Sequence, residues 1–144
     1  MPTPASIGRH PIHPILVGIP VGLWVFSLVA DLIVLFGLGG PVWKVVAFYS
    51  IGGGLVGAIL AAIPGVVDFL SITDEEVGGI ARNHLILNLV AVALFAISMG
   101  LRFASPLGGL PVLVSAVAVA VLGLAGWLGG EMVFIHGMGV KAAE

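Results

Sequence analysis

Four long runs of hydrophobic residues dominate the chain, separated by short segments that are polar or rich in glycine and proline. The runs cover about residues 14–37, 42–70, 83–104 and 111–134. Each is long enough for an α-helix to cross a hydrocarbon core of about 30 Å. Because the connections are short, neighbouring helices must be antiparallel. The pattern predicts an all-α, transmembrane up-down-up-down four-helix bundle that forms a single domain, 1–144, and the sequence shows no convincing internal repeat.

The composition supports an integral membrane protein embedded in a lipid bilayer. Of the 144 residues, 60% are hydrophobic and only 8% are charged, whereas soluble domains have about 25% charged residues. The net charge of −2 gives no reason to expect a nucleic acid partner. The chain has no cysteine, which excludes disulfides, cysteine-ligated iron–sulfur clusters and covalently attached c-type haem.

The predicted topology places the N-terminus, the 71–82 loop and the C-terminus at one end of the bundle, called the near end below. The loops at 38–42 and 105–110 share the far end. The near end has three basic residues, Arg9, Arg82 and Lys141. The far end has two, Lys44 and Arg102. By the positive-inside rule, this small excess favours cytoplasmic termini.

All four histidines and several other polar side chains belong to the near end: His10, His13, Asp68, His84, Asn88, Glu131 and His136. A single histidine at a membrane boundary is more often an interfacial residue than a ligand. Four histidines from three different helices change that balance, because polar groups facing the interior of a membrane bundle usually mark a cofactor, an ion site or a proton path. His84 and Asn88 lie one helical turn apart and therefore share a face.

We expect the histidines to bind haem b. Two neutral imidazoles from facing helices are a common pair of axial ligands, and His13, His84 and His136 are the main candidates, with His10 less favoured. Small residues at intervals of four in the second run, Gly57, Ala61 and Gly65, would let a porphyrin approach. The same spacing is also typical of close helix packing. Asp68 and Glu131 would accept N–H bonds from ligand histidines.

Two alternatives stay open. In the first, the same four histidines, together with Asp68 or Glu131, hold a non-haem iron, zinc or copper ion. In the second, the chain is a cofactor-free accessory subunit of a larger membrane complex or a homo-oligomer. The sequence predicts no catalytic residue, so an electron-transfer protein or a redox subunit is favoured over a stand-alone enzyme.

Several local features carry structural predictions. In HPIHP, residues 10–14, each proline should keep the histidine before it out of helical conformation. Pro20 and Pro64 should kink their helices and widen the near end. Asp31 should pair with Lys44 or Arg102, because an unpaired carboxylate is costly at membrane depth. Residues 73–76, TDEE, should form a solvated loop in which Thr73 caps a short helix.

Four blocks of the sequence resemble the bacterial DUF2231 family of small membrane proteins: HPIHPILVGIPVGLWVFSLVADL, GLVGAILAAIPGVVDFL, RNHLILN and GWLGGEMVFIHGMGV. The resemblance spans nearly the whole chain and implies a bacterial cytoplasmic membrane. The family is similar to di-haem cytochrome b proteins, and some relatives are joined to Rieske-type domains. The resemblance therefore implies electron transfer between a membrane quinol and a redox partner. It also implies that the family's histidines correspond to His10, His13, His84 and His136 of this chain. Many members have a further histidine where this chain has Gly18, so a second haem would lack one ligand here.

Overall fold

The computed structural model describes residues 3–104 and 109–140, and most of them belong to four long helices. Each of these helices is long and apolar enough to cross a membrane. They are α1 (Ile12–Leu35), α2 (Val42–Leu70), α3 (Glu75–Ala104) and α4 (Gly109–Phe134). The predicted all-α class and the number of spans are confirmed.

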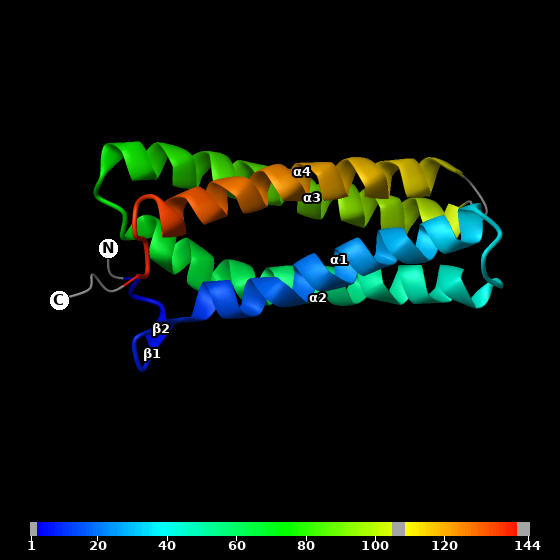
Figure 1. Cartoon of the computed structure of the whole chain (residues 1–144), viewed down its shortest axis with the longest axis horizontal. Helices are drawn as coiled ribbons and strands as arrows, with labels where there is room; N and C mark the ends of the chain where they lie inside the picture. Colours follow the sequence, from blue (N-terminus) through cyan, green and yellow to red (C-terminus); the bar gives the residue numbers. More distant parts are fainter. Residues whose placement is uncertain (1–2, 105–108, 141–144) are drawn as a thin grey trace.

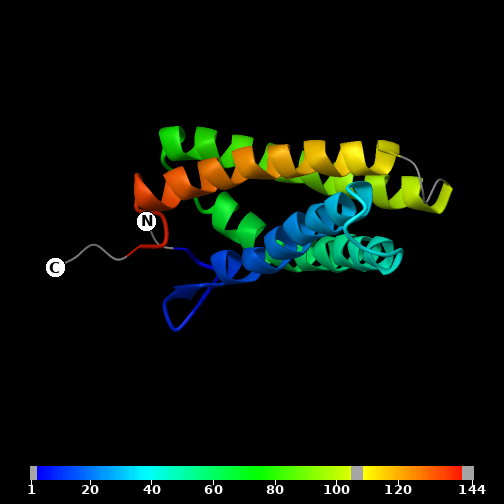
Figure 2. The ribbon, with the colours of Figure 1, turned by 45° about the vertical axis from the view of Figure 1, so that its right-hand side comes forward.

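The helices form two antiparallel hairpins that lie against each other. In Figure 1, α1 runs alongside α2, and α3 runs alongside α4. Contacts between the hairpins join α2 to α3 and α1 to α4, so α1 and α3 lie diagonally opposite each other. Figure 2 shows the hairpins as two layers, with both terminal segments at the near end. Side chains of the diagonal pair therefore meet in the centre of the bundle.

The start of α3 differs from the prediction. The helix begins at Glu75, eight residues before the predicted 83, and residues 75–76 belong to its first turn and not to a loop. Asp74, and not Thr73, provides the cap: its Oδ1 accepts a hydrogen bond from the N–H of Val77 at 3.0 Å. Glu75 and Glu76 add negative charge at the helix N-terminus, where it is favourable. The polar residues thus extend α3 beyond its apolar run.

The segment before α1 forms a small antiparallel hairpin. Strands β1 (Ser6–Ile7) and β2 (His10–Pro11) pair through a tight turn in which Gly8 and Arg9 have φ values of +55° and +68°. His10 is extended, as predicted from the proline that follows it. His13 is helical, so the prediction for that residue is wrong. Because α1 begins at Ile12, Pro14 lies in the first turn, where its missing N–H breaks no helical bond.

The centre of the bundle is an aromatic stack between the diagonal helices. The rings of Trp24 and Phe95 are stacked with centroids 4.4 Å apart and planes 13° apart, and both side chains are buried. The indole N–H of Trp24 donates to the carbonyl of Ile51 at 3.3 Å. Gly54 of α2 leaves the space that the indole occupies, because a Cβ there would overlap it. Packing at this level leaves no room for a larger residue at position 54.

Pro20 and Pro64 are buried within α1 and α2, and both helices continue through them. Pro20 packs closely against α2 at Gly57. A Cβ added at Gly57 would lie 3.2 Å from Cδ of Pro20. Widening of the near end by these prolines stays a prediction.

Candidate functional site

His13 of α1 and His84 of α3 face each other at the near end of the bundle. Their ring centroids are 6.3 Å apart, and the ring planes are nearly perpendicular at 87°. Both residues are half-buried. The two helices are diagonal partners, so this pair spans the middle of the bundle. The Trp24–Phe95 stack spans the bundle in the same way, closer to the midpoint of the helices. Two of the four predicted ligands are therefore brought together.

A hydrogen bond to the neighbouring helix fixes the orientation of each ring. The Nδ1 of His13 lies 2.8 Å from the carbonyl oxygen of Ala61, and the Nδ1 of His84 lies 2.8 Å from that of Ala125. A carbonyl oxygen can only accept, so Nδ1 carries the hydrogen in both rings. In a neutral imidazole, the lone pair is then on Nε2. This is the tautomer in which histidine binds a metal through Nε2 while a backbone carbonyl holds its other nitrogen.

A glycine lies beside each ring, one helical turn beyond the carbonyl that holds it. A Cβ at Gly65 would lie 2.7 Å from Nδ1 of His13, and a Cβ at Gly129 would lie 3.1 Å from Cε1 of His84. Gly65 follows Ala61 by four residues, and Gly129 follows Ala125 by four. Both hairpins thus use an alanine carbonyl and a glycine to seat a histidine.

The small residues predicted to admit a porphyrin lie between α1 and α2. A Cβ at Gly57 would lie 3.0 Å from Cγ2 of Ile19, and the Gly65 position faces His13. Ala61 is buried and accepts the His13 hydrogen bond. These contacts are the close helix packing that the spacing also suggested. A role of Gly57, Ala61 and Gly65 toward a cofactor stays a prediction.

The site belongs to a repeated arrangement that the sequence analysis missed. Residues that meet across the bundle are 71 positions apart in the chain: His13 with His84, Trp24 with Phe95, and Asp31 with Arg102. Only the histidines are identical among these three pairs, so the repeat cannot be recognised from residue identity. The repeat is one of position, because buried Ser27 and Ser98 also share the spacing. The two hairpins are related by an approximate two-fold axis between α1 and α3.

At the far end, the predicted ion pair of Asp31 is confirmed, with Arg102 as the partner. Two hydrogen bonds, of 2.8 Å and 2.6 Å, join the guanidinium to the carboxylate. Arg102 also donates to Ser115 at 3.3 Å, and Ser115 lies 2.8 Å from the hydroxyl of Ser98. Ser98 donates to the carbonyl of Pro111 at 2.8 Å. This network links α1, α3 and α4.

The other two histidines lie outside the four helices. His10 is exposed in the N-terminal hairpin, where its Nδ1 lies 2.9 Å from the carbonyl oxygen of Gly8. His136 lies in the turn after α4, and its backbone N–H donates to the carbonyl of Glu131. In residues 3–104 and 109–140, no three histidine or acidic side chains are grouped so that they could hold a metal ion. The structure therefore brings His13 and His84 together, and a ligand role of His10 or His136 stays a prediction.

Asp68 has a structural partner at the near end. Its Oδ1 accepts a hydrogen bond of 2.9 Å from the backbone N–H of Ala5, and the residue is buried. The carboxylate thereby ties the N-terminal segment to the end of α2. Support of a ligand histidine by Asp68 or Glu131 stays a prediction.

Asn88 is the polar neighbour that the structure places on the site. Its amide nitrogen lies 3.1 Å from Nε2 of His84 and 2.8 Å from the carbonyl oxygen of the same residue. Since Nδ1 of His84 carries the hydrogen, Nε2 is the acceptor and Asn88 the donor. The predicted sharing of one helical face by these residues is confirmed.

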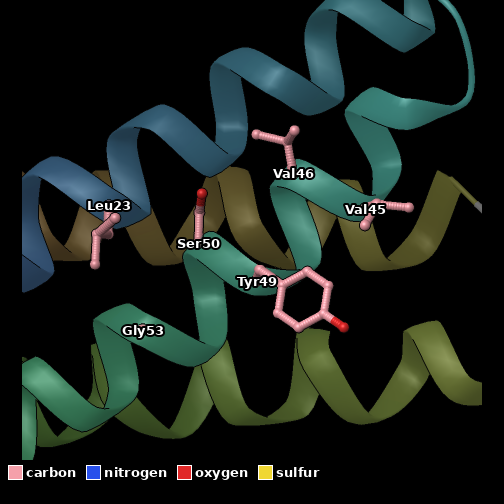
Figure 3. Close-up of a pocket in the computed structure, with 6 residues that line it drawn as sticks. All are labelled: Leu23, Val45, Val46, Tyr49, Ser50 and Gly53. Atoms are coloured by element: carbon pink, nitrogen blue, oxygen red, sulfur yellow. The ribbon is translucent and has the colours of Figure 1, made fainter.

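A shallow hollow of about 390 Å³ lies elsewhere, on the outer face of the α1–α2 hairpin toward the far end. Figure 3 shows Val46 and Ser50 directed toward α1 and the Tyr49 ring directed away from it. The lining is mainly apolar: Leu23, Val45, Val46, Tyr49, Ser50 and Gly53. It shares no residue with the histidine pair.

Comparison with known proteins gives one result. The model of a family described as "Predicted membrane protein (DUF2231)" matches residues 9–142. Neither the curated proteins nor the solved structures gave a match.

Proposed function

The chain belongs to the DUF2231 family of predicted membrane proteins, and we propose that it is a b-type membrane cytochrome with His13 and His84 as the axial ligands of one haem. The observation that carries this proposal is a pair of neighbouring imidazoles, each held by its Nδ1–H, in a part of the chain whose described residues contain no group of three histidine or acidic side chains able to hold a metal ion.

The number of ligands favours haem over a bare metal ion. A structural zinc site takes four protein ligands, and a catalytic one takes three. A haem iron already has four nitrogens from the porphyrin and needs two from the protein. His13 and His84, with ring centroids 6.3 Å apart, would supply those two.

The residues around the pair would prepare it for this role. The carbonyls of Ala61 and Ala125 hold both imidazoles in the metal-binding tautomer. Because the carbonyls belong to α2 and α4, each ring plane is fixed by its own hairpin. Gly65 and Gly129 give the rings room to approach those helices closely. When bound, haem would supply one-electron redox chemistry, and bis-histidine ligation would leave no open position for oxygen.

Electron transfer is the activity that this site supports best. We propose a membrane quinol as the electron donor and a redox protein as the acceptor, with the chain acting as a redox subunit. The histidine pair lies toward one end of the bundle, because His13 is the second residue of α1. A cofactor there would be close to one membrane surface, where a partner protein could exchange electrons with it.

The test is an absorption spectrum of the purified protein, first oxidised and then reduced with dithionite. The proposal predicts a Soret band and the sharp reduced bands of a low-spin bis-histidine haem. His13→Ala and His84→Ala should each abolish that spectrum, whereas His10→Ala and His136→Ala should retain it. Bound iron, zinc or copper without a Soret band would support the metal-site alternative. Absence of both haem and metal, with normal folding, would support the accessory-subunit alternative.

A further inference from the structure

We propose that Asn88, through its hydrogen bond to Nε2 of His84, competes with the cofactor for that nitrogen; this inference rests on the haem function proposed above. Asn88 is a positioning residue in this role, because it acts through His84. Its amide nitrogen lies 3.1 Å from Nε2, the nitrogen that would bind iron.

The arrangement around His84 shows that Asn88 is not needed to set the tautomer. The carbonyl of Ala125, 2.8 Å from Nδ1, already places the hydrogen on that nitrogen. The hydrogen bond from Asn88 therefore has one effect on the ring of His84: it occupies the lone pair of Nε2. Asn88 also has a second acceptor, the carbonyl oxygen of His84 at 2.8 Å. The amide can keep that hydrogen bond while it releases the ring.

The approximate two-fold symmetry shows that this amide is an addition to one half of the site. The position 71 residues before Asn88 is Val17, which follows His13 by the same four residues. Valine cannot donate a hydrogen bond from its side chain, so the two imidazoles differ at their Nε2 nitrogens. We infer that the His13 nitrogen coordinates first and that coordination by His84 requires the Asn88 amide to turn away.

This inference predicts opposite effects for exchanging the two residues. Asn88→Val should raise the affinity for haem by roughly 2- to 12-fold, as expected when one competing hydrogen bond is removed. Val17→Asn should lower it, because the new amide can bond to Nε2 of His13. Simple damage to the fold would lower affinity in both variants, so the sign of the Asn88→Val effect separates competition from damage.

The experiment is a titration of the purified cofactor-free full-length protein with hemin in detergent, followed by stopped-flow measurement of the Soret change. Wild type, Asn88→Val, Val17→Asn and the double exchange would be compared, with His13→Ala/His84→Ala as the control for hemin that partitions into the micelle. Higher affinity and faster binding for Asn88→Val, with an unchanged bis-histidine spectrum, is the expected result. Equal or weaker binding with that same spectrum would overturn the role of Asn88 alone. Spectra of wild type that match the double-alanine control would overturn the haem proposal and this inference with it.

Discussion

Arg102 donates two parallel hydrogen bonds to Asp31, from Nη1 to Oδ1 at 2.8 Å and from Nη2 to Oδ2 at 2.6 Å. The side chains are only 9% and 3% exposed. Bidentate pairing is the strongest geometry available to these groups, and it joins α3 to α1 across the bundle. Because both side chains are buried, each charge depends on the other for its neutralisation. The far end therefore depends on both members being present together.

We expect Asp31→Ala to lower the free energy of unfolding by about 3–5 kcal/mol, because it leaves the buried guanidinium of Arg102 without a counter-charge. The double variant Asp31→Leu/Arg102→Leu should be more stable than Asp31→Ala, because it leaves no buried charge. Unfolding followed by circular dichroism in detergent measures both. Lys44→Leu is the control, since Lys44 shares the far end without belonging to this pair, and it should change stability by less than about 0.5 kcal/mol. A double variant less stable than the single one would contradict the prediction.

Gly65→Ala should weaken haem binding by about 10–100-fold, the usual effect of disturbing a group that orients a metal ligand. The new methyl group would lie 2.7 Å from Nδ1 of His13 and would break its hydrogen bond to Ala61. Gly129→Ala should have a smaller effect, because its methyl group would lie 3.1 Å from His84.

Hemin titration measures both variants, with Gly126→Ala as the matched control, because a Cβ at Gly126 meets nothing within 4 Å. Equal affinities for all three variants would show that the glycines beside the rings do not seat the histidines.

Gly54→Ala should destabilise the bundle by about 1–3 kcal/mol, the usual cost of overfilling a packed core. Its methyl group would overlap the indole of Trp24 and displace it from Phe95. The loss should appear as a lower melting temperature and a weaker near-ultraviolet circular dichroism signal. Gly54→Ala combined with Trp24→Phe should recover part of the stability, because the smaller ring vacates the space. If the double variant melts below Gly54→Ala, overlap with the indole is not the cause.

Asp68→Ala should release the N-terminal segment without unfolding the helices, because it removes the acceptor of the Ala5 N–H bond. Arg9 is exposed in the turn of this segment, so trypsin should cleave after it several-fold faster, as expected for a locally opened segment. Mass spectrometry of timed digests measures the rate. Asp68→Asn keeps an oxygen acceptor and should resemble wild type. Equal cleavage of all three proteins would argue that this hydrogen bond does not hold the segment.

The sequence predicted the spans well because each depends only on a local run of apolar residues. It also predicted the partner of Asp31 within two candidates, since few charges were available at that end of the bundle. The start of α3 was missed because Asp74, Glu75 and Glu76 are polar, and hydropathy alone ends a helix where its apolar residues end. Their value as cap and first-turn residues comes from the helix terminus and not from hydrophobicity.

The candidate site was predicted only in part. Its location at the near end followed from the alternating direction of the helices. Selection of His13 and His84 from four histidines required the diagonal placement of α1 and α3, which depends on how two hairpins pack. His10 and His136 lie in segments outside the helices, whose paths an apolar pattern does not describe. The alanine carbonyls were invisible in advance, because any residue type has a carbonyl.

The spacing of 71 residues between facing positions has a consequence for how this family can vary. Three levels of the bundle contain a pair with one member from α1 and one from α3, so the volume and charge available to one position of a pair depend on its partner. Natural relatives should therefore change these positions together: a smaller ring at 24 with a bulkier side chain at 95, or loss of the acid at 31 with loss of the base at 102. Each half of the gene constrains the evolution of the other.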